Sequence, residues 1–182
     1  MQIILASASP RRRQILGEIL SDFLVIPAHG EERADLTLPP EQIVCALAKA
    51  KAAEIALEHA DALVIGSDTI VYFDGKVLGK PKSEEDAFHT LKSLSGREHS
   101  VFTGLCLIKG EKEIAEAVES RVLFHELSDE FISSYVKSGS PMDKAGSYGI
   151  QDGGLVKSYF GSYTNIIGLP KEKLQELLRK FL

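Results

Sequence analysis

Short apolar runs alternate with amphipathic stretches through the first half of the chain. Runs of strand length occupy residues 3–6, 23–26 and 63–73. Between them, residues 10–20 and 40–59 place apolar side chains at the spacing of one helix face. This pattern predicts strands separated by helices. The sequence Gly-Ser-Asp-Thr at 66–69 is predicted to interrupt the third strand.

The second half is predicted to be richer in strands. A hairpin turn at Asp74-Gly75 leads into a short strand around residues 77–78. Paired strands are predicted over 99–108 and 117–125, and helices over 83–96, 128–139 and 170–182. The glycine-rich segment 146–154 is interpreted as a structural loop. Residues 1–182 are therefore expected to form a single domain of the α/β class, with a mixed, elongated central sheet flanked by helices and a cleft between two lobes.

Three consecutive arginines, residues 11–13, stand in the first turn of the first predicted helix. Ser9 is a good N-cap, and Pro10 suits the first helical position. The start of a helix carries partial positive charge, so cations there oppose the helix dipole unless an anion is bound. With Ser7 and Ser9 beside it, this turn could bind phosphate. A solvated basic turn is the alternative.

Composition narrows the classes of function. The net charge of −5 argues against nucleic-acid binding, which needs a basic surface. No apolar run approaches the length of a membrane span, and the first residues do not form a signal peptide. Cys45 and Cys106 are too few for a disulfide framework. We expect a cytoplasmic protein that binds neither nucleic acid nor membrane, and whose arginines suit a small anionic ligand.

Asp68 is the strongest candidate for chemistry. Strand alternation gives it the same face as Val64, Gly66 and Ile70, where an apolar residue would normally pack. A carboxylate in such a place needs a partner, a metal or a raised pKa. Glu32, on a loop, could share a divalent cation with it. The alternatives are an Asp bonded locally at a strand end and a solvated Glu.

Two lysines also occupy unusual positions. Lys51 lies at the edge of the apolar stripe of the helix predicted over 40–59, although a snorkelling lysine explains this equally well. Lys80 is displayed between Gly79 and Pro81. The surrounding string is one residue too short for a P-loop and has proline where a hydroxyl must bind magnesium, so that interpretation is rejected. The five histidines show no spacing typical of a zinc site.

Several short motifs follow one another over nearly the whole chain. They are LASASPRR at 5–12, LAKAKA at 47–52, GSDT at 66–69, LGKP at 78–81, LSGR at 94–97 followed by His99, TG at 103–104, DKAG at 143–146, YGIQ at 148–151 and GLP at 168–170. This ordered set resembles the Maf family of nucleoside triphosphate pyrophosphatases, also described as septum-formation-inhibitor-like proteins. The chain departs from the family pattern at Asp152, where glycine is usual, and in a shorter loop before residues 161–163.

The resemblance implies hydrolysis between the α- and β-phosphates of a nucleoside triphosphate, which releases a nucleoside monophosphate and pyrophosphate. Asp68 would be the general base, and a divalent cation, Mg²⁺ or Mn²⁺, would be held near Glu32 and Asp68. The residues expected to bind phosphate are Ser7, Ser9, Arg12, Lys51 and Lys80.

At Arg11, Thr69 and Gln151 the chain resembles the branch of the family that acts on dTTP and UTP. The hydroxyl of Thr69 and the amide of Gln151 would read the pyrimidine edge. An alternative function is a non-catalytic nucleotide-binding regulator of cell division or septum formation, which would need the cations but not Asp68. The oligomeric state is left open, and a homodimer is compatible with the sequence.

Overall fold

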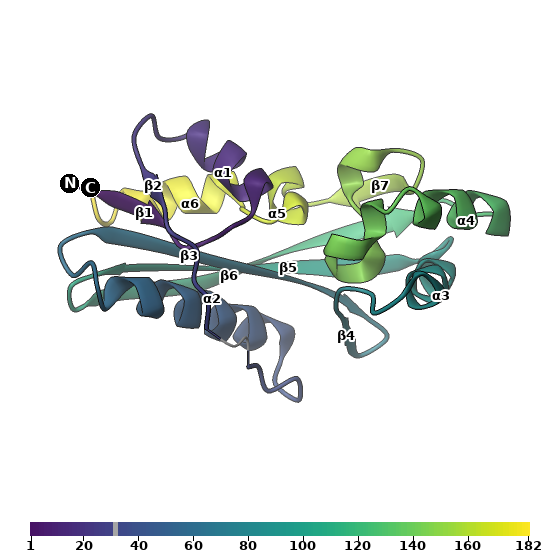
Figure 1. Ribbon diagram of the computed structural model, residues 1–182, viewed down its shortest axis with the longest axis horizontal. Coiled ribbons are helices and arrows are strands. Elements are labelled where there is room, and N and C mark those ends of the chain that lie inside the picture. The colour runs from purple at the N-terminus through teal and green to yellow at the C-terminus, as the bar shows by residue number, and fades with distance from the viewer. Residues whose placement is uncertain (31–32) are drawn as a thin grey trace.

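The computed structural model describes residues 1–30 and 33–182, which form a long central sheet with helices on both faces (Figure 1). The strands are β1 (Ile3–Leu5), β2 (Leu24–Val25), β3 (Leu63–Phe73), β4 (Lys76–Leu78), β5 (Glu98–Lys109), β6 (Lys112–Phe124) and β7 (Val156–Phe160). Their order is β2-β1-β3-β5-β6-β7, with β4 paired to β3. β1 pairs in parallel with β2 and β3, and the other pairings are antiparallel. The expected mixed sheet is confirmed.

The helices divide the molecule into two lobes joined by the long strands β3, β5 and β6 (Figure 1). They are α1 (Pro10–Gly17), α2 (Pro40–Ala56), α3 (Glu84–Leu94), α4 (Asp129–Lys137), α5 (Tyr163–Ile167) and α6 (Lys171–Leu178), with 3-10 turns η1 (Ser140–Asp143), η2 (Ala145–Ser147) and η3 (Ile150–Asp152). In the first lobe α2 covers one face of the sheet, and α1 and α6 cover the other. In the second lobe α3, α4 and β7 lie at the far end of the sheet.

Strand alternation distributes the apolar side chains of β3 between two cores. Val64 packs with Ala48 of α2 on one face, and Ile65 packs with Leu16 of α1 and Leu177 of α6 on the other. The second lobe has its own core, which includes Leu91, Phe124 and Ile132. Each lobe therefore buries a separate set of apolar residues, and the long strands hold the two sets together.

Helix α2 lies unusually close to the sheet. A Cβ atom on Gly66 of β3 would stand 2.2 Å from the carbonyl oxygen of Ala48, and one on Gly104 of β5 would stand 2.2 Å from that of Val44. Neither distance is sterically allowed, so both positions require glycine while α2 keeps this position. The close approach brings Lys51 of α2 within reach of β3.

Several expected boundaries were wrong. β3 is continuous through residues 66–69, because these residues pair with β5 in unbroken register from Gly66 with Cys106 to Thr69 with Thr103. β6 begins at Lys112 rather than at residue 117, because it pairs with β5 from the first residue after a tight turn. The predictions omitted β7 and α5.

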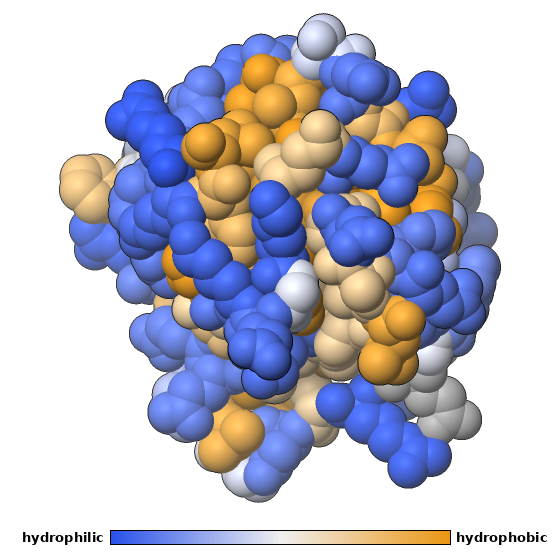
Figure 2. Space-filling model, turned by 90° about the vertical axis from the view of Figure 1, so that its left-hand side faces the viewer, coloured by the Kyte–Doolittle hydropathy of each residue, from blue (hydrophilic) through white to orange (hydrophobic). Residues whose placement is uncertain are grey.

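The predictions for the helix starts were more accurate. The predicted N-cap Ser9 is confirmed, because its hydroxyl accepts a hydrogen bond from the Arg12 backbone N–H, and Ser83 and Ser128 cap α3 and α4 in the same way. None of the helices in the described ranges combines the length and hydropathy that a membrane crossing requires. The end of the molecule that carries both termini presents apolar patches broken up by polar residues (Figure 2). Such a mixture is ordinary protein surface and indicates no binding site at this end of the molecule.

Candidate active site

The cavity lies where one edge of β3 is uncovered. β1 pairs with β3 at residues 63–65 and β4 pairs with it at 71–73. In the part of the chain that the structure describes, no strand pairs with residues 66–70 on that edge. A cavity of about 550 Å³ borders this gap, walled by α1, α2, the segment after β4, α5 and the turns at 143–151. Because β3 meets the cavity edge-on, side chains from both of its faces reach the same space.

Asp68 faces α2, and its side chain forms an ion pair with Lys51. It shares this face with Gly66 and Ile70, as strand alternation predicts. The residue is only 8% exposed, and a carboxylate buried to that degree needs a compensating charge. Lys51 supplies this charge. The alternative of an Asp bonded locally at a strand end was wrong, because β3 continues beyond Asp68 to Phe73.

Thr69 points to the opposite face of the sheet and belongs to a network around Arg12. The Thr69 hydroxyl accepts from the Arg12 guanidinium at 3.2 Å and bonds the Thr103 hydroxyl at 2.9 Å. The Arg12 Nε donates to the Gly168 carbonyl at 2.8 Å, and its Nη1 donates to Ser7 Oγ at 3.3 Å. Arg12 therefore cross-links α1, β3 and the turn after α5, as well as bordering the cavity.

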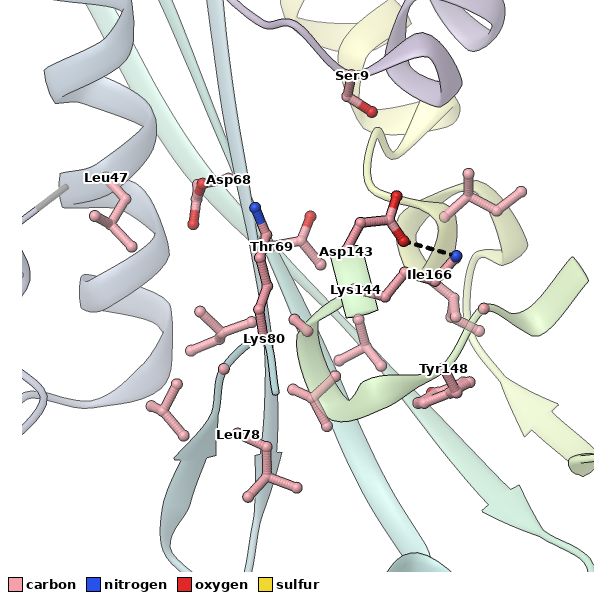
Figure 3. A pocket seen from close by; sticks show the side chains of 18 of the residues that line it. Ser9, Leu47, Asp68, Thr69, Leu78, Lys80, Asp143, Lys144, Tyr148 and Ile166 are labelled. Atoms are coloured by element: carbon pink, nitrogen blue, oxygen red, sulfur yellow. Dashed lines mark hydrogen bonds and ion pairs between the residues drawn. The ribbon is translucent and has the colours of Figure 1, made fainter. Parts of the chain in front are cut away.

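The structure gathers most of the residues that the sequence singled out. Those lining the cavity are Ser9, Arg11, Arg12, Lys51, Asp68, Thr69, Lys80 and Gln151. The side chain of Lys80 runs from the segment after β4 toward Asp68 and Thr69 (Figure 3). Ser7 is buried behind the wall, where it also accepts from the Ser9 backbone N–H at 3.2 Å. Glu32 lies outside the described residues.

The donor set at the cavity suits a hard cation only in part. Asp68 presents carboxylate oxygens, which Mg²⁺ and Mn²⁺ prefer as ligands, and Lys51 contacts one of them. Within residues 1–30 and 33–182, no three His, Cys, Asp or Glu side chains are grouped so that they could hold a metal ion. Asp68 could therefore supply carboxylate oxygens to a cation, but the described residues do not complete a metal site.

An ion pair and its hydrogen bonds form the wall opposite β3. The Lys144 Nζ donates to Asp143 Oδ1 at 2.9 Å and to the Ser140 carbonyl at 2.6 Å (Figure 3 shows the first contact). Asp143 also lies 3.7 Å from the Arg11 guanidinium. The ammonium of Lys144 and the guanidinium of Arg11 hold the pKa of Asp143 below its usual value. This wall therefore carries charge of both signs.

Tyr148 adds an aromatic surface to the same wall. Its ring contacts His99 and Phe124 edge-on, and its hydroxyl lies 2.7 Å from His99 Nε2. Burial raises the pKa of Tyr148 and lowers that of His99 to about 4. At neutral pH both groups are uncharged, so the pair fixes the position of the tyrosine without adding charge to the cavity.

The sequence comparisons agree on the family. A family model described as "Maf-like protein" matches residues 2–181. The chain belongs to the Maf family. A dTTP/UTP pyrophosphatase of Thermococcus onnurineus (strain NA1) is 49% identical over 180 residues, covering 96% of this chain and 97% of its own. The protein of the same name from Aquifex aeolicus (strain VF5) is 47% identical over 184 residues, covering 99% and 95%.

Solved structures that resemble this Maf chain show the fold alone, because their sequences have diverged far. A HAM1 protein from Coxiella burnetii aligns with a TM-score of 0.58 at 16% identity, over 99% of each chain. The HAM1 protein from Staphylococcus aureus aligns with a TM-score of 0.52 at 15% identity, over 100% of this chain and 97% of its own. The expected architecture of a sheet flanked by helices is thereby confirmed.

Sequence reasoning missed the wall formed by Asp143, Lys144 and Tyr148 in this Maf chain. All three lie inside motifs that carried the family resemblance, DKAG and YGIQ, but they received no role. A signal was present: Lys144 stands beside Asp143 and just ahead of a glycine-rich segment. Their place at the cavity depends on the turns η1 to η3, for which neither the helical nor the strand period gives a signal.

Proposed function

We propose that this chain hydrolyses dTTP and UTP to the nucleoside monophosphate and pyrophosphate. The observation that carries the proposal is a buried carboxylate, Asp68, beside a cavity bordered by the cations Arg11, Lys51 and Lys80. The names of the relatives support the same activity. A regulator that only binds nucleotide would need these cations but no buried carboxylate, so Asp68 favours an enzyme. Because free nucleotides are the substrate, we propose that it acts in the cytoplasm.

The cationic end of the cavity suits the triphosphate. Hydrolysis adds water across the bond between the α- and β-phosphates, and negative charge develops on the departing pyrophosphate. Lys80, from the segment after β4, and Lys51, from α2, would neutralise this charge, with Arg11 and Arg12 nearby. Ser9 Oγ, which caps α1, lies at the same end of the cavity. The helix start and the cations together form an anion site.

Asp68 would accept the proton of the attacking water. The Asp68 carboxylate forms an ion pair with Lys51, and this contact would hold the general base in place beside the cavity. Asp68 and Glu32 would hold the divalent cation, Mg²⁺ or Mn²⁺, which supplies positive charge to the phosphate oxygens and makes the water more acidic. The residues of the chain orient the substrate, hold the base and keep the reacting bond near β3.

The other end of the cavity would hold the nucleobase of the substrate. Gln151 lines it with an amide, which offers one acceptor and one donor, and Tyr148 adds an aromatic surface. An amide of this kind can pair with the O4 and N3–H edge of uracil or thymine. Thr69 lies between the two ends. Because its hydroxyl already bonds Arg12 and Thr103, it would act on the base through the position of Arg12 as well as directly.

A turnover screen tests this function. The purified chain is incubated with dTTP, UTP, CTP, ATP and GTP, and both pyrophosphate and the monophosphate are measured. We expect dTTP and UTP to be hydrolysed well ahead of ATP and GTP, because mismatched bases leave the polar groups of the site without partners. Removing divalent cations with a chelator is expected to stop turnover, and adding Mg²⁺ or Mn²⁺ to restore it. Release of inorganic phosphate and a diphosphate would contradict the proposal.

A further inference from the structure

The carboxylate of Asp152 is the centre of a polar network next to Gln151. Its Oδ2 accepts from the Tyr135 hydroxyl at 2.5 Å and from Ser140 Oγ at 2.6 Å. Tyr135 belongs to α4 and Ser140 to η1, so one carboxylate joins three separate pieces of the second lobe. Hydrogen bonds to an ionised acceptor are stronger than those between neutral groups.

The same network holds both ends of the segment that carries Gln151. The backbone N–H of Gly149 donates to the Tyr135 hydroxyl at 3.1 Å, and the N–H of Asp152 donates to the Gly149 carbonyl at 3.0 Å. Tyr135 therefore contacts residues 149 and 152, directly before and after the pair Ile150-Gln151. The turn η3 is closed on itself and fastened to α4.

Charge keeps the central carboxylate ionised. Burial alone would raise the pKa of Asp152, but the bonds from Ser140 and Tyr135 and the nearby charges of Lys144 and Arg11 lower it on balance. The Lys144 ammonium donates to Ser140, the residue that also bonds Asp152. The network therefore extends from Asp152 through Ser140 and Lys144 to the cavity wall.

Close packing leaves little freedom inside the segment. A Cβ atom on Gly149 would stand 3.0 Å from Lys144 Cε and 3.2 Å from Asp152 Oδ2. Immediately after it, Gly153 and Gly154 have φ values of +75° and +76°, which turn the chain away toward β7. Residues 149–152 are therefore bounded by fixed contacts on one side and by a sharp change of direction on the other.

We propose that Asp152 is a positioning residue for base selectivity, which holds η3 on α4 and thereby fixes Gln151 at the cavity. This inference rests on the proposed function. Gln151 itself is exposed and has a long side chain, so its backbone must be fixed if its amide is to discriminate between bases. Arg11 is linked to the same support through Asp143 and Lys144. Two of the predicted specificity residues thus depend on one network.

Substitution of Asp152 tests the inference through the ratio of kcat/KM for dTTP to that for ATP. Asp152→Ala is expected to lower this ratio about 3- to 10-fold, the worth of roughly one hydrogen bond, through a raised KM for dTTP at a nearly unchanged kcat. Asp152→Asn keeps an acceptor oxygen and should restore most of the ratio. In a Gln151→Ala background, Asp152→Ala should cause a much smaller further change, because only its indirect link to Arg11 remains.

Asp129→Ala is the matched control. Asp129 is an exposed carboxylate at the start of α4, in the same lobe, and its partner Lys92 lies away from the cavity. This variant should leave the ratio unchanged. An equal loss of kcat/KM for all triphosphates in Asp152→Ala, or an undiminished effect in the Gln151→Ala background, would overturn the inference.

Hydrogen exchange separates this inference from the proposed function. The Gly149 amide donates to Tyr135, which should protect it from exchange, and in unliganded Asp152→Ala we expect it to exchange at least about fivefold faster. Unchanged protection overturns the anchor whatever the turnover. If the parent chain hydrolyses no triphosphate or does not discriminate between bases, the proposed function fails, and the exchange measurement still decides whether Asp152 holds the segment.

Discussion

The two ends of the cavity are built in different ways. At the end proposed for catalysis, called the catalytic end and defined by Asp68 and Lys51, the side chains stand on β3 and α2, regular elements fixed by backbone hydrogen bonds and a close helix–sheet contact. At the end proposed for nucleobase recognition, called the recognition end and defined by Tyr148 and Gln151, they lie on or beside short 3-10 turns held by bonds between side chains.

The difference shows which part of the site can change. Regular elements hold a reacting group within a small distance of its partner, which chemistry requires. Side-chain bonds can be lost or gained by single substitutions without breaking a strand or a helix. We therefore expect changes at the catalytic end to lower the rate for every substrate, and changes at the recognition end to alter the choice between substrates.

The largest expected effect is at the catalytic end. Asp68→Asn should lower kcat about 10²- to 10⁴-fold, because the amide is nearly isosteric but cannot accept a proton. Binding of dTTP and the dTTP-to-ATP ratio should remain close to those of the parent. Steady-state kinetics and calorimetric titration measure all three quantities. Asp74→Asn, in the turn after β3, is the control. Turnover within a few-fold of the parent would mean that another residue, with Glu32 the first suspect, is the base.

Acid should weaken the recognition end. The pKa of His99 is about 4 in the folded chain and near 6.5 when exposed, so the unfolded chain takes up the proton first as pH falls. Keeping His99 neutral therefore stabilises the folded chain by up to about 3 kcal/mol. This contribution to the free energy of unfolding is complete above pH 6.5 and is lost as pH falls through 4. Urea unfolding measured between pH 7.5 and 4.5 should show that the free energy of unfolding falls less steeply with pH in His99→Phe than in the parent. Parallel curves for the two proteins would contradict this assignment.

Arg12 cross-links α1, β3 and the turn after α5, so its removal should lower the stability of the folded chain. Arg12→Ala takes donors from Gly168, Thr69 and Ser7, and we expect it to lower the free energy of unfolding by about 1–3 kcal/mol. Arg13→Ala, one residue along, is the control. It should be neutral or slightly stabilising, because a cation in the first turn opposes the helix dipole. Thermal melts without ligand compare the two. Equal stability would show that the Arg12 network contributes nothing to folding.

The smallest effect is expected from Gln151→Ala. Loss of one amide contact should narrow the preference for dTTP over ATP about 2- to 10-fold, at a nearly unchanged kcat for dTTP. Competition kinetics with both triphosphates present would measure the ratio directly, and Gln175→Ala on α6 is the control. A fall in kcat as large as that of Asp68→Asn would remove the distinction between the two ends.

Local patterns predicted the placement of the side chains around Asp68 well. Strand alternation gave Asp68 the same face as Gly66 and Ile70, and helical periodicity placed Lys51 at the edge of the apolar stripe of α2. Their ion pair could not be predicted, because it depends on how α2 crosses β3. That Arg12 bonds Gly168, far along the chain, was likewise invisible to any local period.

The recognition end was predicted poorly for a physical reason. β7 gives little burial signal, since residues 157–160 are all exposed, and it depends on pairing with β6, on the packing of Val156 against the core of the second lobe and on the ring contact of Tyr159 with α5. The turns η1 to η3 depend on bonds such as Tyr135 to Asp152, between residues on different elements. The family resemblance indicated Gln151 there, but nothing in the sequence indicated what holds it. The roles of both ends stay predictions until they are tested.

The contact between α2 and the sheet limits how the chain can diverge. At Gly66 and Gly104 there is no room for even one methyl group, so substitution there must displace the helix and with it the Lys51 ammonium. The distance between Lys51 and Asp68 therefore cannot be changed by small substitutions at these two glycines. Around Asp152 and Ser140, each bond can be exchanged singly while the sheet stays intact. Substitutions around Asp152 can therefore alter the residues proposed to contact the nucleobase without moving Lys51 and Asp68, the pair proposed to carry the chemistry.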